Sequence, residues 1–82
     1  MKQFLYISAA WCGPCRMLGP TMNQLQQEGY SVRKVDADTE SNIVQQYGVR
    51  NIPTVILLNN GKEVARMVGN NSKDSYIKLW NR

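Results

Sequence analysis

Both cysteines of this 82-residue chain lie three positions apart, within Trp11-Cys12-Gly13-Pro14-Cys15. Without another thiol, the chain can form at most one intramolecular disulfide, and that bond would close a very small ring. A bridge this short removes little entropy from the unfolded chain, so it stabilises a fold only weakly. The spacing therefore favours a dithiol that opens and closes during function over a structural crosslink.

The length and composition predict one small domain spanning residues 1–82. A chain of this size buries roughly 60 to 65% of its accessible surface on folding, which is enough for a single core. No segment approaches the ~18 consecutive apolar residues of a membrane span. The first residues run into the cysteine motif without a secretory cleavage pattern. We therefore expect a cytoplasmic protein, where a close cysteine pair is more often catalytic or metal-binding than structural.

The charge pattern argues against a nucleic-acid partner, and the glycine pattern argues against a bound nucleotide. The net charge of +4 is spread along the chain, with no basic run and no basic–aromatic repeat. The glycine fingerprint of a dinucleotide-binding fold is also missing from the sequence. These features predict a solvated, mildly basic surface, with a preference for acidic partners left as the alternative.

Strand and helix patterns alternate along the chain. Apolar runs and β-branched residues predict strands, whereas apolar residues at helical spacing predict helices. The expected strands are 4–7, 32–36, 54–58 and 63–68, and the expected helices are 13–28, a short one around 43–47, and one after residue 72. Asn59-Asn60-Gly61 indicates a tight hairpin between the last two strands.

The resulting order, βαβαββα, predicts an α/β fold. Its first three elements form a βαβ unit, whose strands run parallel with a right-handed crossover. The hairpin adds an antiparallel strand, so we expect a four-stranded mixed sheet with helices on both faces. Within the first helix Pro20 cannot bond the carbonyl of Arg16, which predicts a kink or a break. Thr39 or Ser41 is expected to cap the short helix, and Ser72 the last one.

The cysteine motif is expected where the first strand ends and the first helix begins. Free N–H groups and the dipole at a helix start favour an anion, so the pKa of Cys12 should fall below that of an ordinary thiol. Cys15 lies one helical turn later, within reach of a mixed disulfide formed by Cys12. Gly13 permits a tight turn and Pro14 sets the backbone angle of the first helical turn.

A metal site and a pair of inert buried thiols are the alternatives to a redox dithiol. Zinc prefers four ligands, and the chain offers two cysteines and no histidine. An iron–sulfur cluster would need a second chain to complete its ligands. We therefore expect no metal and no cofactor other than the Cys12–Cys15 disulfide itself.

Trp11-Cys12-Gly13-Pro14-Cys15 resembles the active site of the thioredoxin family in all five positions. The resemblance continues through Lys34-Val35-Asp36, Tyr47-Gly48-Val49-Arg50, Ile52-Pro53-Thr54, Asn60-Gly61 and Val68-Gly69. It implies a minimal thioredoxin fold and a protein-disulfide reductase. By resemblance, Cys12 attacks the substrate disulfide and Cys15 resolves the mixed disulfide.

The resemblance also implies a docking surface and partners. Ile52-Pro53 is similar to the family's cis-proline loop, and the implied substrate-binding residues are Ile52, Pro53, Thr54 and Gly69. Trp11 would complete the apolar surface around Cys12. The implied partners are disulfide-containing proteins and an NADPH-linked thioredoxin reductase, with the chain itself acting as a monomer.

The sequence departs from the family in two ways. Typical thioredoxins begin with an additional strand and helix, so the predicted order is closer to a minimal, glutaredoxin-like core. Gly13-Pro14 nevertheless differs from the Pro-aromatic pair of glutaredoxins, which disfavours a glutathione-dependent reductase.

The second departure is chemical. Tyr6 occupies the position of the family's buried aspartate, a proton acceptor for the resolving thiol, and Lys34 lacks that acidic partner. A tyrosine is a poor base near pH 7, so we expect slower or more pH-dependent resolution.

Two other functions stay open on the sequence alone. The chain could be a thioredoxin-fold binding subunit of a larger complex, although intact Cys12 and Cys15 argue against a redox-dead scaffold. It could also be an oxidant or isomerase, which would require an oxidising compartment.

Overall fold

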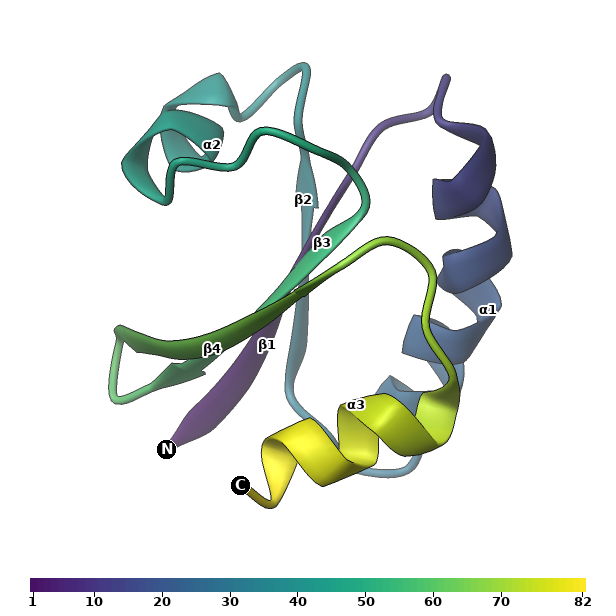
Figure 1. The fold of residues 1–82 in the computed structure, drawn as a ribbon, viewed down its shortest axis with the longest axis vertical. Coiled ribbons are helices and arrows are strands. Elements are labelled where there is room, and N and C mark those ends of the chain that lie inside the picture. Colours follow the sequence, from purple (N-terminus) through teal and green to yellow (C-terminus); the bar gives the residue numbers. More distant parts are fainter.

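A computed structural model describes all residues from 1 to 82 and places a four-stranded sheet between helices (Figure 1). The elements follow the predicted βαβαββα order. They are β1 (Lys2–Ser8), α1 (Gly13–Gln27), β2 (Val32–Asp36), α2 (Ser41–Gln46), β3 (Thr54–Asn59), β4 (Lys62–Val68) and α3 (Lys73–Trp80). The predicted α/β fold class is therefore confirmed.

The sheet has the order β2-β1-β3-β4. β1 runs parallel to β2 and antiparallel to β3, and β3 runs antiparallel to β4. β1 therefore lies in the interior of a mixed sheet, and all four residues from Phe4 to Ile7 are buried. A continuous apolar run suits a strand that is covered on both faces.

Alternate residues of β1 enter two separate cores. Phe4 and Tyr6 pack with residues of α1, β3 and α3 on one face of the sheet. Leu5 and Ile7 pack with residues of β2, α2 and β3 on the other face. Figure 1 shows α1 and α3 together on one side of the sheet and α2 on the opposite side. This layering fixes the start of α1 against the end of β1, where the cysteines lie.

Two local predictions were wrong. α1 runs unbroken from Gly13 to Gln27, so the break considered at Pro20 does not occur, and Leu18 and Met22 are fully buried on either side of the proline. The N-terminal cap of α2 is Glu40, not Thr39 or Ser41, and its side chain makes no capping bond.

The carboxylate of Glu40 instead accepts hydrogen bonds from the Arg33 guanidinium and the Asp36 N–H, each at 3.2 Å. These bonds hold the residue before α2 against the end of β2. The predicted Ser72 cap of α3 is confirmed, since its hydroxyl accepts a hydrogen bond from the Ser75 N–H at 3.2 Å.

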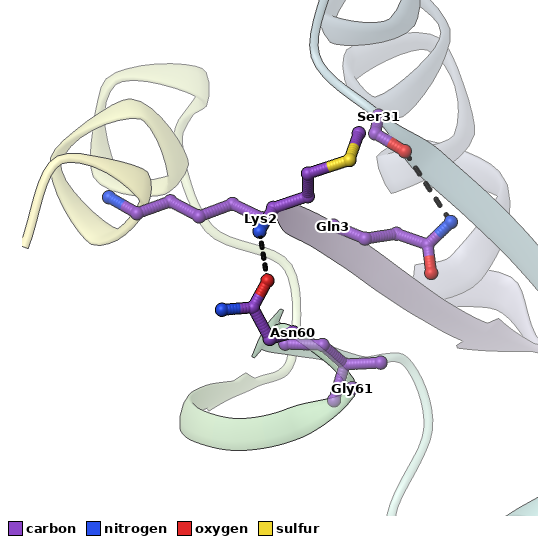
Figure 2. A pocket seen from close by; sticks show the side chains of 7 residues that line it. Lys2, Gln3, Ser31, Asn60 and Gly61 are labelled. Carbon is purple, nitrogen blue, oxygen red and sulfur yellow. Dashed lines mark hydrogen bonds between the residues drawn. The ribbon is translucent and has the colours of Figure 1, made fainter.

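The only pocket of the molecule, drawn in Figure 2, has neither cysteine in its lining. It is lined by the first residues of β1, by Ser31, and by Asn60 and Gly61 of the β3–β4 turn. Figure 1 shows both chain termini at this end of the sheet and the start of α1 at the other end. None of the helices is long and apolar enough to cross a bilayer.

Candidate active site

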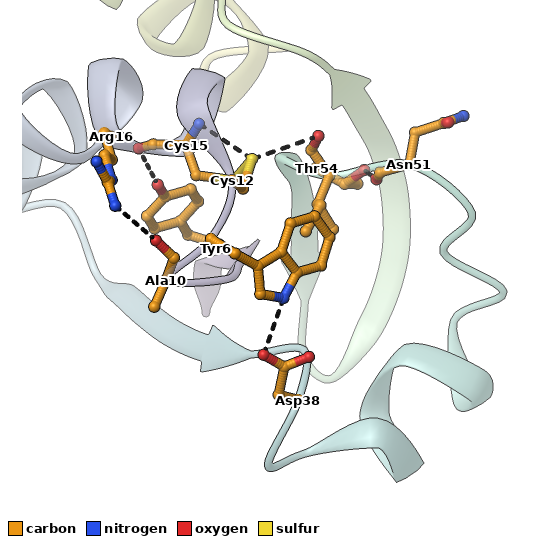
Figure 3. The surroundings of a disulfide bond; sticks show 10 residues. Tyr6, Ala10, Cys12, Cys15, Arg16, Asp38, Asn51 and Thr54 are labelled. Atoms are coloured by element: carbon orange, nitrogen blue, oxygen red, sulfur yellow. Dashed lines mark hydrogen bonds between the residues drawn. A yellow bond between two sulfur atoms is a disulfide. The ribbon is translucent and has the colours of Figure 1, made fainter.

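Cys12 is the N-terminal cap of α1 and forms a disulfide with Cys15 (Figure 3). The two Cα atoms are 5.2 Å apart. The backbone of Cys12 is extended, and its Sγ accepts a hydrogen bond from the Cys15 N–H at 3.2 Å. A cap residue normally offers a side-chain oxygen to such an N–H. Here the Cys12 sulfur takes the place of that oxygen. The Cys15 N–H therefore points at the atom that carries the negative charge when Cys12 is a thiolate.

The rest of the motif shapes this helix start. Gly13 and Pro14 form the first turn of α1 and are exposed. Proline is favourable here because its missing N–H would have no helical partner anyway. Both cysteines are almost completely buried, with 5% of Cys12 and 4% of Cys15 exposed. Little of either cysteine is therefore accessible to a partner in the oxidised protein.

Trp11 precedes Cys12 in the chain, and 67% of its surface is exposed. Its indole Nε1–H donates a hydrogen bond of 3.0 Å to Oδ2 of Asp38, which follows β2 (Figure 3). The bond fixes the direction of an exposed ring next to Cys12. Sequence reasoning missed Asp38. Its place just after β2 was the available signal, because the carboxyl ends of the parallel strands β1 and β2 lie at one edge of the sheet.

Two loops meet the cysteines from the other side. The Ile52–Pro53 peptide bond is cis, as the family resemblance implied. The carbonyl oxygen of Ile52 lies 3.8 Å from Sγ of Cys12. The carbonyl oxygen of Pro53 accepts a hydrogen bond of 2.8 Å from the Gly69 N–H. The structure therefore brings Cys12, Ile52, Pro53 and Gly69 together from three distant segments of the chain.

Thr54 supports this arrangement from inside. It is fully buried at the start of β3, and its hydroxyl donates a hydrogen bond of 2.6 Å to the carbonyl oxygen of Asn51. Its side chain therefore closes the loop around the cis peptide bond and offers no exposed group.

Tyr6 lies beneath the cysteines and is buried (Figure 3). Its hydroxyl donates a hydrogen bond of 2.9 Å to the carbonyl oxygen of Cys15. Burial raises the pKa of Tyr6 above its ordinary value of 10.0, because a phenolate would lose its hydration. Tyr6 therefore keeps its proton at neutral pH and acts here as a hydrogen-bond donor.

Lys34 does not reach the cysteines. It is exposed on β2, and its ammonium group donates a hydrogen bond to Oδ1 of Asn23 on α1. No group of three or more His, Cys, Asp or Glu side chains that could hold a metal ion occurs in the structure.

Comparison with known proteins adds a family to this geometry. The model of the thioredoxin family matches residues 2–82. Over 76 residues the chain is 50% identical to the thioredoxin of Chlamydia caviae, covering 90% of this chain and 74% of that protein. Over 77 residues it is 36% identical to the thioredoxin of Bacillus subtilis, with coverage of 90% and 74%.

Solved structures give the same result. A mutant thioredoxin from Halobacterium salinarum superposes with a TM-score of 0.92 at 33% identity, covering 98% of this chain and 72% of that one. Fasciola hepatica thioredoxin superposes with a TM-score of 0.91 at 31% identity, covering 99% and 79%. The chain thus matches between 72 and 79% of the length of these four proteins.

Proposed function

Because this chain belongs to the thioredoxin family of protein-disulfide oxidoreductases, we propose that Cys12 is its nucleophile and Cys15 its resolving thiol. The observation that carries this assignment is the 3.2 Å hydrogen bond from the Cys15 N–H to Sγ of Cys12. In the reduced protein the same N–H, at the positive end of α1, would stabilise a thiolate on Cys12. Cys15 has no comparable donor among the hydrogen bonds of the structure.

The first step forms a mixed disulfide. The Cys12 thiolate attacks one sulfur of the substrate disulfide, the substrate S–S bond breaks, and the other substrate sulfur leaves as a thiolate that takes a proton from water. Trp11, Ile52, Pro53 and Gly69 form the docking surface that holds the substrate segment during this attack.

The second step releases the product. Cys15 loses its proton and attacks Sγ of Cys12, which closes the Cys12–Cys15 disulfide and expels the second substrate thiolate. The chain is oxidised by two electrons and the substrate disulfide is reduced to two thiols. Water accepts the proton of Cys15, because Tyr6 is protonated and its hydroxyl already donates to the Cys15 carbonyl.

The substrates of a thioredoxin are protein disulfides. We propose that the chain acts as a monomeric reductant in the cytoplasm, because net reduction of substrates requires a reducing compartment. Its disulfide is then returned to the dithiol by two electrons from an NADPH-linked thioredoxin reductase.

Cysteine variants test the two roles directly. We would measure insulin reduction with dithiothreitol as the recycling reductant for the parent chain, Cys12→Ser and Cys15→Ser. Only the parent should turn over, and Cys15→Ser should accumulate a mixed disulfide with insulin that non-reducing electrophoresis detects. Turnover that survives Cys12→Ser would falsify the assigned nucleophile. A mixed disulfide trapped by Cys12→Ser would reverse the two roles.

A further inference from the structure

Tyr76 on α3 is fully buried, yet its hydroxyl reaches the loop between β4 and α3. The hydroxyl donates a hydrogen bond of 3.2 Å to the carbonyl oxygen of Gly69. It also accepts a hydrogen bond of 3.3 Å from the Asn71 N–H. One buried group therefore bonds two backbone positions of a loop whose first residue lies beside the cis proline.

Gly69 is fixed through both of its backbone groups. Its N–H donates to the Pro53 carbonyl oxygen at 2.8 Å, while its own carbonyl oxygen accepts from Tyr76 and from Nδ2 of Asn71 at 3.2 Å. Its φ of +87° is one that other residues rarely adopt. The segment joining β4 to α3 passes on the side of the sheet where α1 lies (Figure 1). The orientation of Gly69 thus depends on bonds to both the core and the Pro53 loop.

Packing alone does not require a hydroxyl at this position. The Tyr76 ring lies in the core with its centroid 6.3 Å from that of Phe4, in an edge-to-face arrangement. A phenylalanine would fill the same space. The hydroxyl is therefore separable from the core, and its partners are the backbone of Gly69 and Asn71.

We infer that Tyr76 is a positioning residue for substrate docking, which acts by holding Gly69 against Pro53. This inference rests on the proposed role of Ile52, Pro53 and Gly69 as the docking surface. Tyr76 touches neither cysteine in any hydrogen bond of the structure. Its effect should therefore appear in the binding of a protein substrate and leave the intrinsic reactivity of Cys12 unchanged.

Tyr76→Phe tests the inference, with two disulfide substrates of different size. Insulin must dock on the protein surface, whereas 5,5′-dithiobis(2-nitrobenzoate) is a small disulfide that needs little docking. We expect KM for insulin to rise about threefold to tenfold with kcat unchanged, as for one lost hydrogen bond. The stopped-flow rate constant for the small disulfide should stay within about twofold of the parent value.

Two further variants make the result specific. Tyr30→Phe removes a hydroxyl that bonds no protein group from an aromatic ring packed against the same core, so both rates should match the parent. Asn71→Ala removes the other side-chain donor to the Gly69 carbonyl oxygen and should also raise KM for insulin. This variant still tests the inference if Tyr76→Phe does not fold. Circular dichroism of each variant checks its fold.

Three results with the variants would overturn the inference. An unchanged KM in folded Tyr76→Phe, an equal loss of rate on the small disulfide, or an equal rise of KM in Tyr30→Phe would each exclude a docking role for the hydroxyl. A parent chain that does not reduce insulin at all would overturn the proposed function together with this inference. A parent that does so, with KM unaffected by Tyr76→Phe, would overturn the inference alone.

Discussion

The hydroxyl of Tyr6 donates a hydrogen bond of 2.9 Å to the carbonyl oxygen of Cys15. Tyr6 stands at the position where the family resemblance implies a buried aspartate, and its hydroxyl bonds the backbone carbonyl of Cys15, the proposed resolving cysteine. It does not replace the aspartate as a proton acceptor, because burial raises the pKa of the phenol further. Cys12 therefore accepts a hydrogen bond at its sulfur, whereas Cys15 is held through its backbone carbonyl and has no nearby proton acceptor in Tyr6.

Tyr6→Asp should accelerate resolution of the mixed disulfide. A carboxylate beneath Cys15 can accept its proton, and burial would raise the pKa of that carboxyl towards neutrality. We expect a gain of about tenfold or more near pH 7, at the lower end of general base effects. Reduced protein mixed with 5,5′-dithiobis(2-nitrobenzoate) in a stopped-flow instrument releases one coloured thiolate on attack and a second on resolution, so the second phase reports the rate. Tyr6→Phe is the control without an ionisable group. Equal second phases in Tyr6→Asp and the parent across pH 6–8 would contradict the proposed proton route.

The raised pKa of Tyr6 also predicts a loss of stability at alkaline pH. Below pH 10 both the folded and the unfolded chain keep the phenol protonated, so its contribution to the free energy of unfolding is fully present. As pH rises above that value the unfolded chain releases the proton first, and the free energy of unfolding falls. Urea unfolding of the oxidised parent and Tyr6→Phe at pH 8 and pH 11 measures this effect. The stability advantage of the parent should shrink at pH 11, and an equal difference at both values would show that the pKa is not raised.

Gly69→Ala and Gly19→Ala should have opposite effects on stability. A Cβ on either glycine would meet no atom within 4 Å, so space does not decide the result. Gly69 has a φ of +87°, and alanine there should destabilise the fold by about 1 kcal/mol. Gly19 lies inside α1, where alanine should stabilise by about 0.5–1 kcal/mol. Urea unfolding at pH 7 gives both values. A stabilising Gly69→Ala would mean that the loop backbone adopts another conformation in solution.

Glu63→Gln should cost stability at neutral pH and little at acidic pH. Arg66 bonds both carboxylate oxygens of Glu63, at 2.6 and 2.7 Å, and donates to the carbonyl oxygen of Tyr47 at 2.6 Å. The hydrogen bonds from Arg66 lower the pKa of Glu63 from its ordinary 4.5. The stabilisation is therefore present above pH 4.5 and lost as pH falls through the lowered pKa. We expect a difference of about 0.5–1 kcal/mol at pH 7 that declines at pH 3. If the free energies of unfolding of the parent and Glu63→Gln differ by the same amount at pH 7 and pH 3, the effect comes from packing and not from the charge of Glu63.

Local patterns were enough to predict the order of the elements, because each depends on neighbouring residues. The apolar run of β1 and the Asn60-Gly61 turn are examples, and both lie where predicted. The cap of α2 was mispredicted because Glu40 takes the cap position without a capping bond, and its carboxylate accepts hydrogen bonds from Arg33 and the Asp36 N–H instead. Pro20 was expected to kink or break α1, and the helix is unbroken there, with Leu18 and Met22 fully buried on either side.

The positions of the two cysteines in the candidate site could be predicted, but the hydrogen-bond partners around them could not. The spacing of Cys12 and Cys15 indicated a dithiol at a helix start, and that geometry is observed. The place of Asp38 just after β2 indicated its edge of the sheet, but its hydrogen bond to Trp11, 27 positions earlier in the chain, was not predictable. Side-chain hydrogen bonds across such distances depend on the final packing of the elements and leave no periodic trace in the sequence.

The near-complete burial of Cys12, with 5% of its surface exposed, limits which bridges in other proteins this chain can attack. A sulfur recessed at a helix start approaches only a disulfide that protrudes from its own protein or lies in a segment that can bend outwards. A bridge packed inside a stable domain stays out of reach until that domain opens. The rate at which this chain reduces a partner should therefore report how often the partner's own structure loosens around its disulfide.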